Sequence, residues 1–442
     1  MRRTGDSCHT HSLHATSRLR VPRLIPTCMR LTCKAPGLLT VVVAICTAGS
    51  PAYAQAVGHA TVQAPAHARE LAPGVTYRQR DDPRGPWRLH ILHVDLRRTE
   101  LKLQAMRALD SLRGRERTSQ MVQRATAAGA RVLAAVNADF FDVLTGENEN
   151  NQVIDGEWWK GLKVTDSPYD SYDNVHAQLA LDMRGRPTID RFILDGTAWS
   201  RSGMLPILSV NAKLSTAMEG TTLYTPRFGA TTPHDPSGDS TRVAIEAPLT
   251  AAGARGDTLL FVRHGALVFT TGSAIPPDGA VLAAHGARAA AVKALAEGDT
   301  VRVLLSTLPR LLGYGPPRVL VGGWPRLLQD GVIVARDAAT LEGTISRNAE
   351  ARHPRTAIGY AKNSRTLWLV TVDGRSAASV GMTLVELAEV MRTLGAWEAL
   401  NFDGGGSTTM VIDGTVVNTP TDASGERPVG NALLLVQTPT LR

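Results

Sequence analysis

The sequence predicts an α+β fold in which mixed, strand-rich sheets carry a few packed helices. Apolar runs of strand length recur along the chain, separated by turns that use many of its 40 glycines. Helical patterns are few, and they do not alternate strictly with the strands. Strict alternation is typical of doubly wound and barrel folds, so the observed order favours α+β.

The first 54 residues have the pattern of a secretory signal peptide. Arg30 and Lys34 precede a short apolar run at 37–46, and Ala52-Tyr53-Ala54 supplies a small-residue cleavage site. The apolar run is too short to span a membrane, and no other segment is long enough. We therefore expect an exported protein, periplasmic or extracellular, without a membrane span. Met29 is an alternative start.

Removal of this segment changes the composition of the chain. The segment carries seven Lys and Arg and one Asp, which is +6 of the total net charge of +8. About +2 remains from Gln55 onward, so the basic balance gives no reason to expect a nucleic-acid partner. The mature chain also has no disulfide, because all four cysteines precede the cut: Cys8, Cys28, Cys33 and Cys46.

Residues 55–129 are predicted to form an N-terminal, strand-rich segment. Residues 87–96 alternate between apolar and polar side chains, as a half-buried strand does. A helix is expected from Thr118 to Ala128, with Met121 and Val122 on its apolar face and Gly129 after its last turn.

Residues 130–442 are predicted to form the main domain, which starts with a buried strand at 131–136. Further strands are expected at 153–154 and 176–182, with loops at 166–174 and 227–240. Residues 242–306 have strands and turns of their own, which indicates an inserted subdomain.

The pattern is clearest from residue 322 onward. A hairpin with Asp330-Gly331 at its turn and a buried strand at 366–372 precede the strongest helix signal. Thr383 and Glu386 form a capping box, an apolar stripe follows, and Gly395 sits just past the helix end. This helix leads into a strand that ends at Asp403.

The most informative stretch is a glycine-rich turn at 404–406 that follows Asp403. Glycines allow positive φ and close approach, and successive N–H groups in such a turn can bind a phosphate. The turn and the two hydroxyls after it are predicted to contact substrate: Gly404, Gly405, Gly406, Ser407 and Thr408. A hairpin turn without chemistry is the alternative.

Three other clusters offer side chains for the same site. Asn137 and Asp139 share one face of an extended segment, and they could bind a sugar, take part in acid–base catalysis, ligate calcium or cap a turn. Arg355 and Thr356 start a strand, where Arg offers a planar fork to a phosphate or makes a surface ion pair. Asp373 opens a turn that could be purely structural.

Taken in order, these clusters resemble the phosphodiester glycosidase family. The resemblance rests on Asn137-x-Asp139-Phe140-Phe141, Gly322-Gly323-x-Pro325, Arg355-Thr356-Ala357-Ile358-Gly359, Asp373-Gly374-Arg375-Ser376 and Asn401-x-Asp403-Gly404-Gly405-Gly406-Ser407-Thr408. It implies a hydrolase that cleaves a sugar-1-phosphodiester between the anomeric carbon and the phosphate, within a catalytic domain at 130–442.

This reaction suggests a role for each candidate. We expect Asp403 to be the catalytic carboxylate, Asp139 its partner, and Arg355 the group that neutralises the leaving phosphate. Substrate contacts are expected from Asn137, Phe140, Thr356, Asp373, the glycine turn, Ser407 and Thr408. No cofactor is expected to be required, although a calcium ion is compatible with the acids. The substrate would be a sugar phosphate or an anionic glycan.

Two alternatives stay open at this point. The same cleft could belong to a non-catalytic protein that binds an anionic exopolysaccharide or a cell-envelope glycan. It could also belong to a glycoside hydrolase that acts on neutral glycans and does not need Arg355. The separation of the two carboxyl groups, which decides between retention and inversion, and the oligomeric state are not readable from the sequence.

Overall fold

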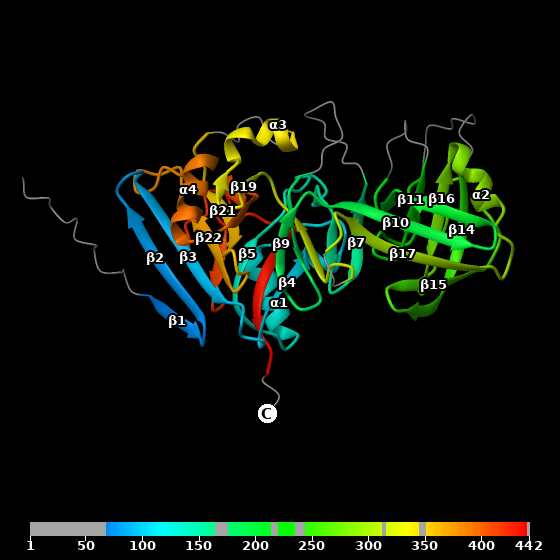
Figure 1. The fold of residues 1–442 in the computed structure, drawn as a ribbon, viewed down its shortest axis with the longest axis horizontal. Helices are drawn as coiled ribbons and strands as arrows, with labels where there is room; N and C mark the ends of the chain where they lie inside the picture. Colours follow the sequence, from blue (N-terminus) through cyan, green and yellow to red (C-terminus); the bar gives the residue numbers. More distant parts are fainter. Residues whose placement is uncertain are drawn as a thin grey trace, which may run out of the picture. The chain divides into compact units, whose positions relative to one another are not determined.

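The computed structural model describes residues 68–163, 176–213, 220–234, 244–311, 315–343 and 351–439. All of them belong to one compact unit, residues 63–442. The predicted signal peptide, the predicted loop at 166–174 and part of the predicted loop at 227–240 lie outside the described residues. Within the described part, the strand-rich fold with few helices is confirmed (Figure 1).

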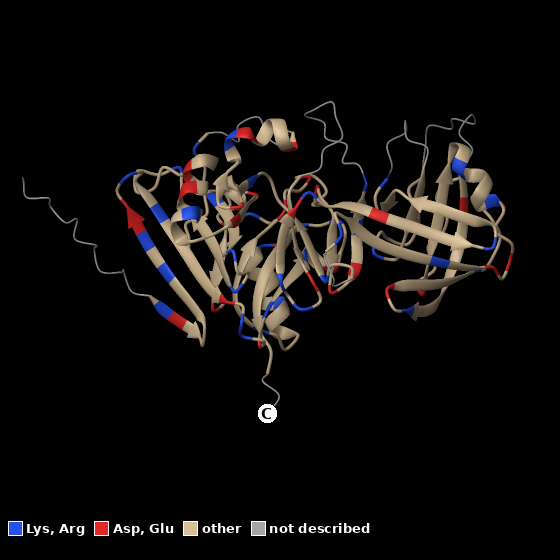
Figure 2. Ribbon diagram, in the orientation of Figure 1, with Lys and Arg blue, Asp and Glu red and all other residues tan. Residues whose placement is uncertain are grey.

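The first sheet has eight antiparallel strands and carries the strand that ends beside Asp403. Its edge strand is short and carries Arg69 and Glu70, charges that discourage pairing with another chain (Figure 2). In spatial order the strands are β1 (Arg69–Ala72), β2 (Val75–Asp82), β3 (Trp87–Asp95), β22 (Thr366–Val372), β21 (Arg355–Tyr360), β23 (Glu398–Phe402), β19 (Arg326–Gln329) and β20 (Val332–Ile333).

The second sheet has five antiparallel strands and joins the start of the domain to its end. In spatial order they are β25 (Thr415–Val416), β24 (Met410–Ile412), β5 (Arg131–Asn137), β26 (Asn431–Gln437) and β4 (Leu101–Arg107). The β5–β24 pairing places the chain after Asn137 next to the chain before Met410.

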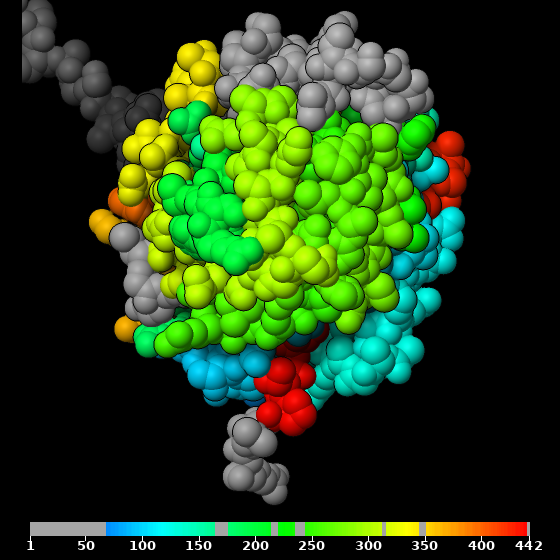
Figure 3. All heavy atoms as spheres, turned by 90° about the vertical axis from the view of Figure 1, so that its right-hand side faces the viewer, coloured from blue at the N-terminus to red at the C-terminus, as the bar shows by residue number. Residues whose placement is uncertain are grey.

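The third sheet has thirteen strands, and among the described strands the one parallel pair, β12–β13, lies in it. In spatial order the strands are β11 (Gly203–Ile207), β10 (Ile193–Ser200), β17 (Thr300–Leu308), β15 (Thr258–Arg263), β14 (Ala244–Arg255), β16 (Gly279–His285), β13 (Thr221–Tyr224), β12 (Ser209–Val210), β7 (Glu157–Leu162), β6 (Gln152–Ile154), β18 (Val319–Gly322), β8 (Gln178–Leu181) and β9 (Pro187–Asp190). The strands numbered β10 to β17 in chain order, coloured green to yellow-green, build most of the face seen in Figure 3. They share a hydrophobic core with neighbouring strands rather than forming a unit limited to 242–306.

Helices are short and few in the described part of the chain. The α-helices are α1 (Thr118–Ala127), α2 (Ala289–Lys293), α3 (Ala338–Glu342) and α4 (Leu384–Leu394), and the 3-10 turns are η1 (Ala108–Asp110), η2 (Gly286–Arg288), η3 (Ala335–Asp337) and η4 (Gly405–Ser407). Helix α4 has the predicted capping box between Thr383 and Glu386, and Gly395 has the predicted left-handed conformation at φ 101°. None of the helices in this part is long and apolar enough to cross a membrane.

The cores explain why the strands around the site are apolar without interruption. Along β22, Leu367 and Leu369 pack into the core shared by the first two sheets, whereas Trp368 and Val370 pack under α4 on the other face. Alternate side chains of a strand point to opposite faces, and both faces of this sheet are covered. The strand carrying Asp403 therefore lies on a rigid, fully packed support.

Candidate active site

Asp403 lies where β23 ends, at the junction of the first two sheets. Its N–H group donates to the carbonyl of Ala138 at 2.8 Å, which ties β23 to the segment after β5. Its carboxylate accepts hydrogen bonds from the N–H of Gly404, at 2.8 Å, and from the hydroxyl of Ser407. Burial raises the pKa of Asp403 to about 6, against the lowering effect of these bonds and of Arg427 and Arg355. Such a carboxyl titrates close to neutral pH, as catalytic groups do.

The glycine turn does not offer the open phosphate nest that its sequence suggests. Four of the five N–H groups from Gly404 to Thr408 already donate within the protein. Gly404 donates to Asp403, and Gly405 to the carbonyl of Pro354 at 2.9 Å; the other two donate inside the turn. The backbone of the turn is therefore used mainly to hold Asp403 and to connect it to the segment before β21.

The glycines instead make room for guanidinium groups. A Cβ atom at Gly406 would lie 2.3 Å from Nη2 of Arg427, and one at Gly405 would lie 3.0 Å from Nη2 of Arg375. Gly405 also has φ +60°, a conformation that disfavours other residues. The positive charge beside the turn thus comes from side chains rather than from free backbone N–H groups.

A cavity of about 250 Å³ opens above Asp403 and the glycines. It is lined by Phe140, Trp324, His353, Arg355, Arg375, Asp403, Gly404, Gly405, Gly406 and Arg427. One carboxylate, three guanidinium groups, an imidazole and two aromatic rings therefore share a space of small-molecule size.

The three arginines come from three different segments of the chain. Arg355, at the start of β21, is buried and donates to the carbonyls of Met382 and Ala351 at 2.9 and 2.7 Å. Burial lowers the pKa of Arg355 to about 10, while Asp403 acts in the opposite direction, so the group stays charged at neutral pH. Arg375 lies 3.5 Å from Nδ1 of His353, and Arg427 is paired with Asp422 at 2.6 Å.

Two aromatic side chains form the apolar part of the cavity. The rings of Phe140 and Trp324 meet edge to face, with their centroids 6.4 Å apart. Trp324 is held by a hydrogen bond from its indole N–H to the carbonyl of Gly343, at 3.0 Å. Such rings can pack against the C–H faces of a sugar while the arginines bind an anion.

Asp139 is buried near Asp403, but it does not line the cavity. Its two carboxylate oxygens accept hydrogen bonds from the side chain of Asn148 and from the side chain and backbone of Asn150, at 2.7–3.1 Å. Burial raises the pKa of Asp139 to about 6. The carboxylate also packs against Gly322, where a Cβ atom would lie 2.4 Å away. Its predicted neighbour Phe140, in contrast, faces the cavity.

Asn137 and Thr356 lie behind Asp403 and connect three strands. The amide nitrogen of Asn137 donates to the carbonyl of Asp403 at 2.7 Å, and its oxygen accepts from Thr356 and from the N–H of Thr409. Both residues are almost fully buried. With these bonds in place, they are arranged to position Asp403 rather than to reach a ligand.

Asp373 and Thr408 also lie outside the cavity lining. Asp373 accepts from the N–H of Thr419 at 2.9 Å and lies 3.6 Å from Nε2 of the buried His90. The carbonyl of Thr408 accepts from Asn418 at 2.9 Å. Both residues therefore shape the loops that carry Arg375 and Arg427.

Sequence reasoning did not select four of the lining residues as site residues: Trp324, His353, Arg375 and Arg427. Trp324, His353 and Arg375 lie inside or next to the motifs used above, whereas Arg427 lies beyond the last of them. A guanidinium or aromatic side chain in or beside such a motif could have indicated a site residue. Whether it reaches the cavity depends on how the motifs come together in the tertiary structure.

A metal site is not evident in the part of the chain that the structure describes. No three His, Cys, Asp or Glu side chains there are grouped so that they could hold a metal ion. The predicted calcium ligand Asp139 has its oxygens engaged by N–H donors, which an ion would have to displace.

With this geometry in place, the comparison with protein families is informative. Residues 239–436 match the sequence model of the phosphodiester glycosidase family. The resemblance to this family that the sequence predicts is therefore confirmed over this part of the chain. The matched region contains Arg355, Arg375, Asp403, the glycine turn and Arg427, while Asn137, Asp139 and Phe140 precede it.

Individual relatives agree with this assignment. The mouse N-acetylglucosamine-1-phosphodiester alpha-N-acetylglucosaminidase is 30% identical over 133 residues, which is 28% of this chain and 25% of the mouse protein. The SPbeta prophage-derived protein YomE of Bacillus subtilis is 33% identical over 107 residues, which is 24% of this chain and 16% of that protein. The matched part thus spans a quarter or less of each relative.

Solved structures share the fold of most of this chain. A protein from Synechocystis superposes with a TM-score of 0.66 at 22% identity, over 85% of this chain and 64% of its own. A Burkholderia pseudomallei protein that is named as exported superposes with a TM-score of 0.59 at 27% identity, over 79% of this chain and 74% of its own.

Proposed function

We propose that this protein hydrolyses a sugar-1-phosphodiester between the anomeric carbon and the phosphate oxygen. One observation carries the proposal: a carboxylate with a raised pKa faces a cavity that also holds three arginines and an aromatic pair. This combination matches a substrate with an anionic phosphate beside an apolar sugar face. The match of residues 239–436 to the phosphodiester glycosidase family supports the same reaction.

Asp403 is assigned the role of catalytic carboxylate. The transition state of glycosidic cleavage is oxocarbenium-like, so an ionised carboxylate beside the anomeric carbon stabilises it or attacks it directly. The C1–O bond breaks, its electrons stay on the phosphate oxygen, and an oxygen from water ends on C1. Ser407 and Gly404 hold the carboxylate in place through its two hydrogen bonds.

Arg355, Arg375 and Arg427 are assigned to the phosphate. The leaving group is a phosphomonoester, which gains negative charge as the bond breaks. Guanidinium groups placed around this oxygen stabilise that charge without a strong general acid. Arg355 is fixed by two carbonyls, so it is preorganised for this task.

The remaining predicted residues are assigned by their contacts. Phe140, with Trp324, is assigned to the sugar face. Asn137 and Thr356 are positioning residues for Asp403, and Asp373 and Thr408 support the loops around the cavity. Asp139 is not assigned a contact with the substrate. It is assigned a supporting role for the site of Asp403, through the hydrogen bonds that it accepts from Asn148 and Asn150.

The test is hydrolysis in water enriched in oxygen-18. The purified protein is incubated with UDP-N-acetylglucosamine, because the mouse relative's name specifies N-acetylglucosamine-1-phosphodiester. Phosphorus NMR then shows whether the released phosphate carries the label. We expect free sugar labelled at C1 and an unlabelled nucleotide diphosphate, because the C1–O bond is the one that breaks.

Two outcomes would overturn the proposal. Label on phosphorus would show cleavage of a P–O bond, which is the reaction of a phosphodiesterase. Binding without turnover across a panel of sugar phosphodiesters would favour a non-catalytic glycan-binding protein. The anomer that forms first, read by proton NMR, separates direct attack by Asp403 from attack by water.

We further propose that the reaction needs no metal ion, because the arginines supply the positive charge. Turnover is therefore expected to be unchanged after dialysis against EDTA. A loss of activity that calcium restores would contradict this assignment and return Asp139 to consideration as a ligand.

A role outside the cytoplasm is part of the proposal. The signal-like segment at 1–54 and the exported Burkholderia neighbour support it. The substrate class would then be a glycan phosphate of the cell envelope or an exopolysaccharide. Secretion of an enzymatically active form cut near Ala54, identified by mass spectrometry, is the expected result.

A further inference from the structure

A second cavity, of about 870 Å³, lies on the curled part of the thirteen-stranded sheet. It shares no lining residue with the cavity at Asp403. Its walls come from β7, β12, β13, β15 and β17, and from the turns next to β6, β14 and β16. We refer to it as the acidic cavity, for the charges described below.

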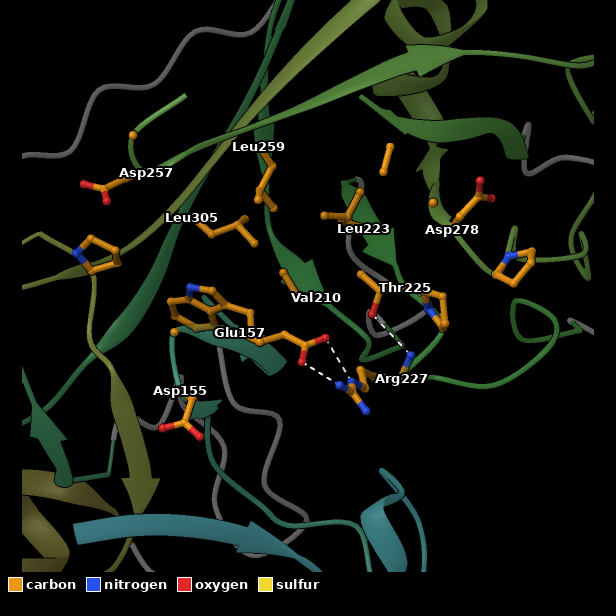
Figure 4. Close-up of a pocket in the computed structure, with 18 of the residues that line it drawn as sticks. Asp155, Glu157, Val210, Leu223, Thr225, Arg227, Asp257, Leu259, Asp278 and Leu305 are labelled. Carbon is orange, nitrogen blue, oxygen red and sulfur yellow. Dashed lines mark hydrogen bonds and ion pairs between the residues drawn. The ribbon is translucent and has the colours of Figure 1, made fainter. Parts of the chain in front are cut away.

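The floor of the acidic cavity is apolar. Figure 4 shows Val210, Leu223, Leu259 and Leu305 grouped in its middle, each from a different strand. Trp158, Pro226, Pro277 and Pro316 extend the apolar lining. A cavity of this volume with an apolar floor and a few polar groups has the properties of a site for a small organic molecule.

The rim carries more negative than positive charge. Asp155, Glu157, Asp257 and Asp278 line the cavity together with one cation, Arg227. Glu157 is paired with Arg227 at 2.7 Å, and Asp155 with Arg318 at 3.1 Å. Asp257 and Asp278 are exposed, and no cation of the described residues pairs with either of them. In Figure 4 these two carboxylates lie on opposite sides of the apolar group.

We propose that the acidic cavity binds an organic cation with an apolar body. The leucines and Val210 would cover the apolar body, and Asp257 and Asp278 would attract the positive charge. The rim charge disfavours a sugar phosphate, so this is not a second copy of the site at Asp403. The inference does not depend on the proposed hydrolase activity.

The test compares three probes with one apolar body. Isothermal titration calorimetry is run with 1-naphthylmethylammonium, 1-naphthalenemethanol and 1-naphthylacetate, which are positive, neutral and negative. We expect the cation to bind at least tenfold more tightly than the anion, and more weakly at high salt, because the rim carboxylates are exposed to solvent. Equal binding of all three probes, or of none, would overturn the proposal.

Matched variants assign the effect to this cavity. Asp257→Asn with Asp278→Asn should reduce the preference for the cation at least severalfold, since both carboxylates are exposed and their loss leaves the core intact. The control pair Asp337→Asn with Glu389→Gln removes the same charge from exposed positions outside both cavities. If the control pair lowers affinity as much, attraction by the overall charge explains the binding and the proposed site is wrong.

A third variant tests the floor, and a fourth tests independence from the site at Asp403. Leu259→Lys places a cation at a lining residue that is already 39% exposed, and it should abolish cation binding in a folded protein.

Asp403→Asn should leave the affinity for the naphthylmethylammonium probe unchanged. A loss of binding in Asp403→Asn would place the probe in the other cavity and refute the proposal.

Discussion

The two cavities of this protein differ in size, in the side chains that line them and in the sign of their charge. The cavity at Asp403 is about 250 Å³, and charged side chains from three distant segments converge on it, with arginines in excess. The acidic cavity is about 870 Å³, has an apolar floor inside one sheet and carries carboxylates in excess. The first fits the proposed hydrolysis, which changes the charge of the substrate, and the second fits the proposed binding of an organic cation. Substitutions in the first should therefore alter turnover, and those in the second only binding.

The largest expected effect is that of Asp403→Asn. The amide cannot attack the anomeric carbon or stabilise its positive charge, so kcat should fall by on the order of 10³–10⁴. Turnover is measured with the sugar phosphodiester, and the naphthylmethylammonium affinity serves as the control for folding. A variant with wild-type turnover would remove Asp403 from the mechanism and erase the distinction between the cavities.

Arg355→Ala should have the next largest effect. Loss of a fixed charge at the leaving oxygen lowers kcat by about 10²–10³. Arg355→Lys should recover part of this loss because it keeps the charge but not the planar fork. Circular dichroism is needed as a control, because Arg355 also binds the carbonyls of Met382 and Ala351. An Arg355→Ala variant that is folded and fully active would favour a neutral-glycan hydrolase.

Activity should decline in acid with an apparent pKa near 6. Burial raises the pKa of Asp403 to about 6, and only the ionised form is active, so each pH unit below that value should lower kcat/KM about tenfold. Asp139→Asn is the control, because the pKa of Asp139 is raised to a similar value. If the decline of kcat/KM in acid disappears in Asp139→Asn, Asp139 is the titrating group.

The raised pKa of Asp403 affects folding stability in the opposite direction to activity. Because the folded-state pKa of Asp403 lies above its unfolded value of about 3.9, folding favours the protonated form. The contribution of this group to stability is thus fully present below about pH 4 and is lost as the pH rises through about 6. Activity and the stability contribution of Asp403 therefore change in opposite directions over this window.

The smallest expected effect is that of Gly406→Ala. A Cβ atom there would lie 2.3 Å from the guanidinium of Arg427, which must move away. The guanidinium is the end of a flexible side chain, so the protein should stay folded while KM rises several-fold to about tenfold. Kinetics on the phosphodiester measure this, and circular dichroism is the control for folding. An unchanged KM would mean that Gly406 is not needed to make room for the guanidinium of Arg427.

Much of the local structure could be predicted because its causes are local. The capping box of Thr383 and Glu386, the left-handed Gly395 and the apolar stripe between them specify α4 within a dozen residues. The buried strands at 131–136 and 366–372 follow from their apolar runs. The position of Asp403 at a strand end, in front of a glycine turn, follows in the same way.

The use of each side chain could not be predicted, because it depends on which strands become neighbours. Asn137 binds Asp403 rather than a ligand because β5 and β23 meet at Ala138. The carboxylate of Asp139 meets Asn148 and Asn150, a pairing that depends on how the following loop folds back. Motifs can indicate that such residues belong to one site, but they do not say which of them face the cavity.

By itself, then, the sequence determined much of the helix and strand pattern, the family resemblance and the position of Asp403 at a strand end before a glycine turn. The tertiary structure alone decided that the N–H groups of the glycine turn are engaged, that three arginines supply the charge instead, and that a separate acidic cavity exists. The physical reason is the separation along the sequence over which each interaction acts. Capping and alternation act over a few residues, whereas burial, pKa shifts and the convergence of charges depend on contacts between segments tens to hundreds of residues apart.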